Sequence, residues 1–175
     1  MRVTVRDAVP SDAAAMGRIK RDAWQAAYRG LLPAEVLESI DADQLATNFG
    51  VQIRASNTQR RPELACLVAA AARHVIGYVT LGPYRLADLA GAGEVYALYV
   101  DPPHWGAGAG RALLLSAEVR LRTMGHDEAA LWVLETNQLG RGFYEAVGWH
   151  PDGVTGEYCE FEGAVEARFR RSLTP

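Results

Sequence analysis

The feature that most constrains this chain is a glycine-rich turn between a strand-like and a helix-like segment. Glu94 to Val100 is rich in β-branched and aromatic residues, and Asp101-Pro102-Pro103 ends it. The turn Trp105 to Gly110 follows. Arg111 to Met124 then repeats apolar residues at helical spacing, with Gly125 just after its end. A strand, a glycine turn and a helix in this order predict an α/β domain.

The position of this turn gives it the chemistry of an anion site. The first N–H groups of a helix have no partner within the helix, and they carry the positive end of its dipole. Glycines let the backbone approach an anion closely. The turn lacks the Gly-Lys-Ser/Thr of a P-loop, and Arg111 or Leu113 stands where a dinucleotide fingerprint needs its third glycine. Phosphate or pyrophosphate binding is the functional interpretation, and a flexible turn is the alternative.

The other segments predict strands and helices around this unit. Ser11 or Asp12 is expected to cap a first helix that starts at Pro10 and is ended by Arg29-Gly30. Further helices are expected at 32–40, 43–53, 111–124 and 139–147, and strands at 2–6, 64–70, 75–81, 94–100, 129–134, 149–158 and 165–170.

Length and composition exclude several classes of protein. A chain of 175 residues with 49% hydrophobic residues suits one packed domain, which is expected to cover 1–175. The net charge of −3 gives no strong attraction to nucleic acid or to an anionic membrane. Cys66 and Cys159 make no disulfide framework, and His74, His104, His126 and His150 have no partners at metal spacing. A cytoplasmic protein without metal, nucleic-acid or membrane partners is expected, because neither a signal core nor a spanning run occurs.

Several short motifs follow one another along the second half of the chain: Val100-Asp101-Pro102, Gly108-Ala109-Gly110, Asn137, Phe143-Tyr144 and Gly148-Trp149. Their order resembles that of the GNAT superfamily of N-acetyltransferases. Trp24 to Pro33 also resembles the first helical pair of many bacterial members. The resemblance implies a mixed, mostly antiparallel sheet of about six to seven strands with a splayed centre, flanked by about four helices. It further implies acetyl-CoA as co-substrate and direct transfer of its acetyl group to a primary amine of a small molecule or protein.

The family pattern also implies which residues contact the cofactor. They are Leu98, Tyr99, Val100, Trp105, Gly106, Ala107, Gly108, Ala109, Gly110, Arg111, Asn137, Phe143 and Tyr144. The backbone near Leu98 would donate to the thioester oxygen on a bulged strand. Trp105 stands where the family's phosphate-binding motif has Gln or Arg. Ala107 stands where the family often has a basic residue. We expect some loss of affinity, because backbone amides carry most of the recognition.

Aminolysis needs a neutral amine, whereas only about one alkyl amine in a thousand is neutral at pH 7. Glu94, at the family's base position, is the candidate base; a solvated strand-end carboxylate is the alternative, and Glu135 remains open. Tyr144 is the candidate acid for the departing thiolate, and a core aromatic is the alternative. Adjacent Phe143 and Tyr144 are not expected to face the same core, which favours the functional role.

Acceptor binding and assembly are the least determined by the sequence. Trp24, Tyr28, Tyr84 and Tyr158 are candidates for an acceptor pocket, with helix packing the favoured alternative for the first two. A homodimer is expected, because members of the family often pair through C-terminal strands and 165–170 alternates as an exposed edge strand would. The competing function is a catalytically weak module that binds acyl-CoA and senses metabolic state.

Overall fold

A computed structural model describes residues 2–58, 61–158 and 163–174. Its seven strands form one sheet in the order β1-β2-β3-β4-β5-β7-β6, antiparallel except for the β4–β5 pair. This confirms the expected mixed sheet, with five α-helices in the described part of the chain. The elements are β1 Val3–Asp7, α1 Ala13–Ala27, α2 Ala34–Glu38, α3 Ala42–Asn57, β2 Ala65–Ala71, β3 His74–Pro83, β4 Gly93–Val100, α4 Ala109–Thr123, β5 Glu128–Leu134, α5 Gln138–Ala146, β6 His150–Glu157 and β7 Val165–Ser172, with short 3₁₀ turns at Pro10–Asp12, Ala87–Leu89 and Pro102–His104.

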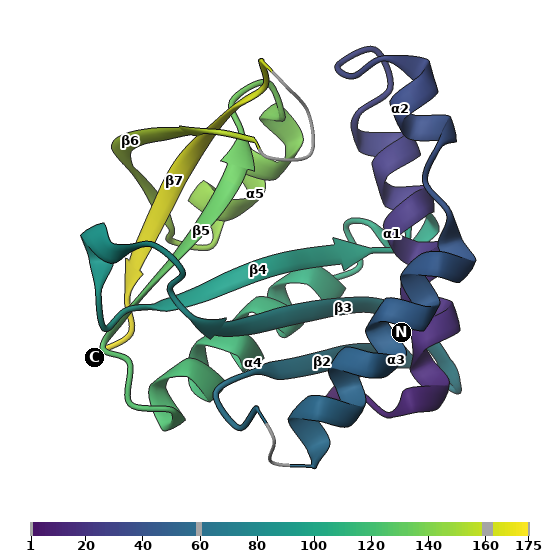
Figure 1. Cartoon of the computed structure of the whole chain (residues 1–175), viewed down its shortest axis with the longest axis horizontal. Coiled ribbons are helices and arrows are strands. Elements are labelled where there is room, and N and C mark those ends of the chain that lie inside the picture. Colours follow the sequence, from purple (N-terminus) through teal and green to yellow (C-terminus); the bar gives the residue numbers. More distant parts are fainter. Residues whose placement is uncertain (1, 59–60, 159–162, 175) are drawn as a thin grey trace.

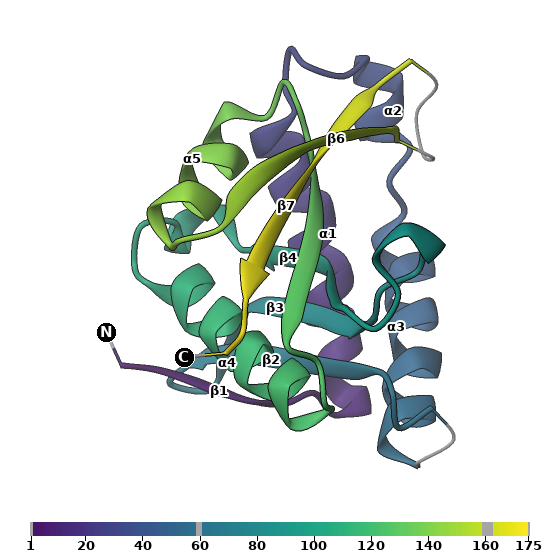
Figure 2. The same cartoon turned by 90° about the vertical axis from the view of Figure 1, so that its left-hand side faces the viewer.

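Helices cover both faces of the β1–β4 half of the sheet. Helix α4 packs on one face, and α1 and α3 pack on the other (Figures 1 and 2). In β2, Leu67 and Ala69 join the core under α4, whereas Cys66 and Val68 join the core under α1 and α3. Burial on both faces explains why this segment reads as one apolar run.

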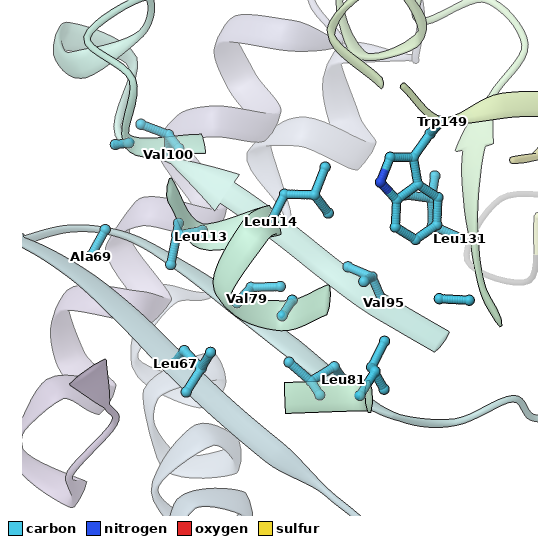
Figure 3. Close-up of a cluster of buried hydrophobic side chains, with 14 of the residues drawn as sticks. Leu67, Ala69, Val79, Leu81, Val95, Val100, Leu113, Leu114, Leu131 and Trp149 are labelled. Atoms are coloured by element: carbon cyan, nitrogen blue, oxygen red, sulfur yellow. The ribbon is translucent and has the colours of Figure 1, made fainter. Parts of the chain in front are cut away.

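The core under α4 holds the largest buried cluster. Leu113 and Leu114 of α4 pack with Val95 of β4 and with Trp149 (Figure 3). The Trp149 side chain is fully buried, and its Nε1 donates to the Glu118 carboxylate at 2.8 Å. A tryptophan at this position therefore needs a buried acceptor, and α4 supplies one.

The sheet is splayed at its centre, as expected. Only Gly93 to Val95 of β4 pair with β5, and the two strands then diverge (Figure 1). On the other side of β4, Ala97 pairs with Thr80 and Val95 with Leu81, which leaves Tyr96 as an extra residue in a β-bulge. A bulge bends a strand and increases its twist, so it accounts for the divergence from β5.

Two expectations were wrong, one about the position of a strand in the sheet and one about a helix cap. Strand β7 lies between β5 and β6, so 165–170 is not an edge strand, and the homodimer stays a prediction without this support. Asp12 does not cap α1 with its side chain. Its carboxylate accepts hydrogen bonds from Arg6 at 2.7 and 2.9 Å and from the Val9 N–H at 2.8 Å. Burial opposes the charge, but these donors outweigh it and lower the pKa of Asp12.

Two further observations concern the length of the helices and the state of a cysteine. Among the described helices, none is long and apolar enough to cross a membrane. Cys66 is buried with its sulfur 4.0 Å from that of Met16, and burial raises the pKa of its thiol to about 12. A thiol so protonated is a poor nucleophile. Cys159 lies outside the described residues.

Candidate active site

A cavity of about 640 Å³ occupies the opening between β4 and β5. Its walls come from the unpaired part of β4, the glycine turn, the end of β5, α5 and α1. Its volume is typical of small-molecule sites. One end of the cavity reaches the glycine turn and the other reaches Glu94, which lies where β4 and β5 are still paired.

The glycine turn has the backbone geometry that the sequence predicts. Gly106 and Gly108 have φ values of 74° and 86°, in the left-handed region that favours glycine. The Ala112 N–H donates to the Gly108 carbonyl at 3.0 Å, so the N–H groups of 109–111 precede the first intrahelical bond of α4. These amides are oriented for an anion, with the side chain of Arg111 also lining the cavity.

Trp105 has a structural role in this turn. Its indole Nε1 donates to the Val100 carbonyl at 2.7 Å, which ties the turn to the end of β4. Half-buried His104, which the sequence did not mark as a site residue, lines the cavity beside it. The expected loss of affinity through Trp105 stays a prediction.

Most of the predicted cofactor residues line the same cavity. They are Leu98, Tyr99, Val100, Trp105, Gly106, Gly108, Gly110, Arg111, Asn137, Phe143 and Tyr144. Ala107 and Ala109 do not line it, and Ala109 is only 1% exposed in the core. A Cβ atom added at Gly110 would lie 3.3 Å from the Phe143 ring, so a glycine here lets α4 and α5 approach closely.

Asn137 joins two walls of the cavity. It caps α5 by accepting a hydrogen bond from the Gly140 N–H at 2.9 Å. Its Nδ2 lies 3.4 Å from the hydroxyl oxygen of Tyr28, at the end of α1. Asn137 therefore caps a helix and also lines the cavity, where the family pattern places it.

Tyr144 lines the cavity and also packs on the core. The rings of Phe143 and Tyr144 are 5.2 Å apart, and both contact the cluster under α4. The expectation that adjacent residues cannot share a core was wrong, because the two rings pack edge to face against each other and both reach the same cluster. Burial, and to a smaller extent nearby Tyr28, raises the pKa of the Tyr144 phenol well above its usual value. The hydroxyl therefore stays protonated and can donate a hydrogen bond.

Glu94 is buried and paired, so the alternative of a solvated carboxylate was wrong. Its side chain is only 1% exposed. It accepts hydrogen bonds from Arg85 Nη2 at 2.6 Å, from Arg85 Nε at 3.1 Å and from the Arg85 backbone N–H at 3.1 Å. Both residues line the cavity, so the carboxylate paired with Arg85 lies at or just behind its wall. Exposed Glu135, the other candidate base, does not line the cavity.

The four acceptor candidates separate into two pairs. Tyr28 and Tyr158 line the cavity. Trp24 and Tyr84 do not: the Trp24 Nε1 donates to the Tyr99 hydroxyl at 2.8 Å, and the Tyr84 hydroxyl accepts from Arg168 at 3.0 Å.

Sequence reasoning missed several polar and aromatic residues that line the cavity. They include Lys20, Gln52, Thr80, Arg85, Tyr96, Trp132 and Glu166. The pattern of alternation along 94–100 and 129–134 could have placed Tyr96 and Trp132 on strands beside the site, but no local motif marks the others. The part of the chain that the structure describes contains no group of three or more His, Cys, Asp or Glu placed to hold a metal ion.

Comparisons with known proteins agree with this geometry. The chain is 28% identical over 162 residues to YuaI, an uncharacterized N-acetyltransferase of Bacillus subtilis, a match that covers 92% of this chain and 87% of that protein. It is 24% identical over 167 residues to the spermidine N(1)-acetyltransferase of Thermoplasma acidophilum, covering 95% of this chain and 100% of that one.

A solved structure shares the fold. The PaiA N-acetyltransferase of Thermoplasma acidophilum, crystallised in complex with coenzyme A, superposes with a TM-score of 0.81 at 23% identity, over 98% of this chain and 99% of that chain. The model of the acetyltransferase (GNAT) family matches residues 22–149, which contain the glycine turn, Glu94 and Tyr144. The chain therefore belongs to the acetyltransferase (GNAT) family.

Proposed function

We propose that this enzyme transfers the acetyl group of acetyl-CoA to a primary amine by direct attack of the amine on the thioester. The observation that carries the proposal is one cavity that reaches from the glycine turn to Glu94 and Tyr144. A site of this shape can hold a long cofactor whose anionic part and reactive end are bound at different places. The coenzyme A in the related PaiA structure supports the same cofactor.

The backbone binds the cofactor in this proposal. The amides of 109–111 receive the pyrophosphate, because they lie at the positive end of α4. The pantetheine arm lies along the part of β4 that has no partner in β5. In an extended strand, alternate N–H and C=O groups point to each side, so this part of β4 offers main-chain partners to the arm. An N–H near Leu98 serves the thioester oxygen as charge develops there.

The reacting atoms lie between Glu94 and Tyr144. The amine loses a proton toward the Glu94 side of the cavity, directly or through a water molecule, and its lone pair forms the new C–N bond. The C–S bond breaks and the electron pair stays on sulfur. Tyr144, held protonated by burial, donates a hydrogen bond to that sulfur. The thiolate then takes a proton and coenzyme A leaves.

The acceptor is a primary amine of a small molecule or a protein, and the enzyme acts as a homodimer. The spermidine named for the relative from Thermoplasma acidophilum supports an amine acceptor. Light scattering at tens of micromolar protein tests the dimer; a monomer mass would contradict it.

Acetyl-CoA binding can be tested at the turn. Calorimetry with Gly110→Val should detect no acetyl-CoA binding, because the new side chain displaces Phe143 and enters the cavity. Gly142→Val is the matched control, since a Cβ there meets nothing within 4 Å and Gly142 lies outside the cavity lining. Unaltered affinity in a folded Gly110→Val protein would contradict the site.

The close pairing of Glu94 with Arg85 favours one competing function, a catalytically weak module that binds acyl-CoA. A carboxylate that accepts several hydrogen bonds from one arginine has fewer lone pairs for an amine. Thiol release measured against a panel of amines separates the two. Tight acetyl-CoA binding without amine-dependent thiol release would favour the module.

A further inference from the structure

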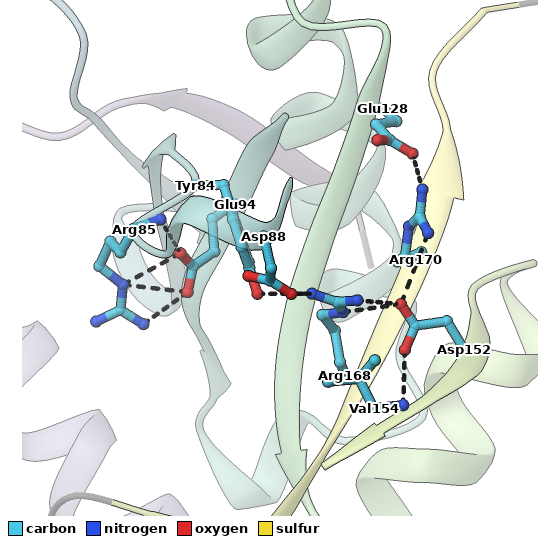
Figure 4. A network of polar contacts seen from close by, with 9 residues as sticks. All are labelled: Tyr84, Arg85, Asp88, Glu94, Glu128, Asp152, Val154, Arg168 and Arg170. Atoms are coloured by element: carbon cyan, nitrogen blue, oxygen red, sulfur yellow. Dashed lines mark hydrogen bonds and ion pairs between the residues drawn. The ribbon is translucent and has the colours of Figure 1, made fainter. Parts of the chain in front are cut away.

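Arg168 of β7 is a buried cation in contact with three separate segments. Its side chain is only 5% exposed. The guanidinium donates from Nη1 to the Tyr84 hydroxyl at 3.0 Å and to Asp88 at 2.5 Å, and from Nε to Asp152 at 2.8 Å (Figure 4). Burial opposes its charge, but these partners outweigh burial and raise the pKa of Arg168, so it stays charged at any working pH.

Tyr84 and Asp88 belong to the loop between β3 and β4, which we call the 84–92 loop. The loop is closed by the Tyr84 N–H, which donates to the Ala92 carbonyl at 2.9 Å. The Gly91 carbonyl lies 2.7 Å from His126 Nδ1, which anchors the far end. Arg168 is therefore the anchor at the near end, through a phenol and a carboxylate.

The same loop carries the arginine that holds Glu94. Arg85 directly follows Tyr84, and it binds Glu94 with both its side chain and its backbone N–H. Arg168 lies opposite Trp132 on β5, one residue beyond Leu131, the last β5 residue paired with β4. The anchor thus lies beside the point where the sheet opens into the cavity, whose wall includes Trp132 and Arg85.

We propose that Arg168 is a positioning residue for acetyl transfer: it fixes the 84–92 loop so that Arg85 holds the Glu94 carboxylate in one orientation. The proposal rests on the proposed function, in which Glu94 serves the amine. Buried ion pairs seldom stabilise a fold more than apolar residues of similar volume would, so stability alone is a weak reason for this network. Its contacts with Tyr84 and Asp88 point instead to placement of the loop. Arg170, two residues along β7, pairs with Glu128 and Asp152, which both lie outside the loop, and this makes it the matched position.

The activity test uses gentle changes on both sides of the contact. Asp88→Asn, Tyr84→Phe and Arg168→Lys should each lower kcat/KM for the amine by about tenfold, because small misplacements of catalytic groups are costly. Acetyl-CoA affinity should not change, since the glycine turn is untouched. Arg170→Lys should behave as the wild type. Full amine kcat/KM in both Asp88→Asn and Tyr84→Phe would overturn the proposal, as would an equal loss in Arg170→Lys.

A double-mutant cycle asks whether the effect passes through Arg85. In an Arg85→Met background, Tyr84→Phe should cause no further loss of amine kcat/KM, because the contact that it supports is gone. A merely structural role would give additive losses in the double variant. Additive losses would therefore contradict the proposal.

Hydrogen exchange tests the anchor without relying on catalysis. Amides of 84–92 should exchange faster in Arg168→Lys than in Arg170→Lys, while amides of α4 stay unchanged. Equal exchange of the loop in the two proteins would overturn the positioning role. A wild-type protein that transfers acetyl to no amine would instead contradict the proposed function, whatever the loop does.

Discussion

The two ends of the cavity present different kinds of chemical group. At the turn end the working groups are backbone amides, fixed by two glycines with positive φ and by the start of α4. At the other end, where we propose that the amine reacts, they are side chains. Glu94 is bonded to Arg85, and Arg85 belongs to a loop bonded to Arg168, which is 84 residues from Tyr84 in sequence. One end is specified locally, and the other is specified by long-range contacts.

This difference predicts where substitutions will be tolerated. Recognition by backbone amides should survive exchanges of neighbouring side chains, and this expectation accommodates Trp105 and Ala107, which stand where the family pattern has other residues. Side-chain recognition fails when any member of the chain of contacts is lost, because a buried group is then left without its partner. Three substitutions would sharpen or break this contrast.

Glu94→Gln should have the largest effect. It keeps the shape of the side chain but removes the charge and the basic oxygen, so we expect kcat to fall about a hundredfold, within the usual range for a general base. Steady-state kinetics with a confirmed amine, beside acetyl-CoA calorimetry, measures the effect. Glu128→Gln is the control, since Glu128 pairs with Arg170 near the surface. Unchanged kcat in Glu94→Gln would leave the amine end without a base.

Tyr144→Phe should have a smaller effect. It keeps the ring that packs against Phe143 and Phe169 and removes only the hydroxyl, so kcat should fall about tenfold while acetyl-CoA affinity and Tm stay unchanged. Because burial raises the pKa of this phenol, it is a donor at every pH below that raised value. The kcat–pH profile of the variant should therefore be lower but unchanged in shape. Full kcat would remove Tyr144 from the mechanism.

Trp105→Phe should have the smallest effect, at the backbone end. The change removes the hydrogen bond from the indole Nε1 to the Val100 carbonyl, but it leaves the backbone amides of 109–111 in place. We expect acetyl-CoA affinity to fall only about threefold to fivefold, the cost of roughly one ordinary hydrogen bond. Calorimetric titration of the wild type and the variant with acetyl-CoA measures this difference in affinity. A loss as large as that of Gly110→Val would show that the turn depends on side chains after all.

The same contrast explains what the sequence could predict. The order strand, glycine turn and helix is local, so the turn, α4 and the Gly125 end of that helix follow from spacing and φ preference. The Asn137 cap is local too. Arg85 and Arg168 could not be found, because arginines are ordinary on loops and strands until the fold brings their partners close. The position of β7 between β5 and β6 was missed for a similar reason: alternation marks two unlike faces, and it does not reveal a strand's neighbours.

The short contact between β4 and β5 has a consequence for the stability of the whole protein. Three residue pairs join the β1–β4 half of the sheet to the β5–β7–β6 half. A ligand that lies in the opening and bonds to both walls bridges β4 and β5 where the two strands are not paired. Such a ligand binds the folded protein but not the unfolded chain. By mass action, saturation at about 100 times Kd adds about 2.7 kcal/mol to the free energy of unfolding. The melting temperature should therefore rise with the concentration of acetyl-CoA.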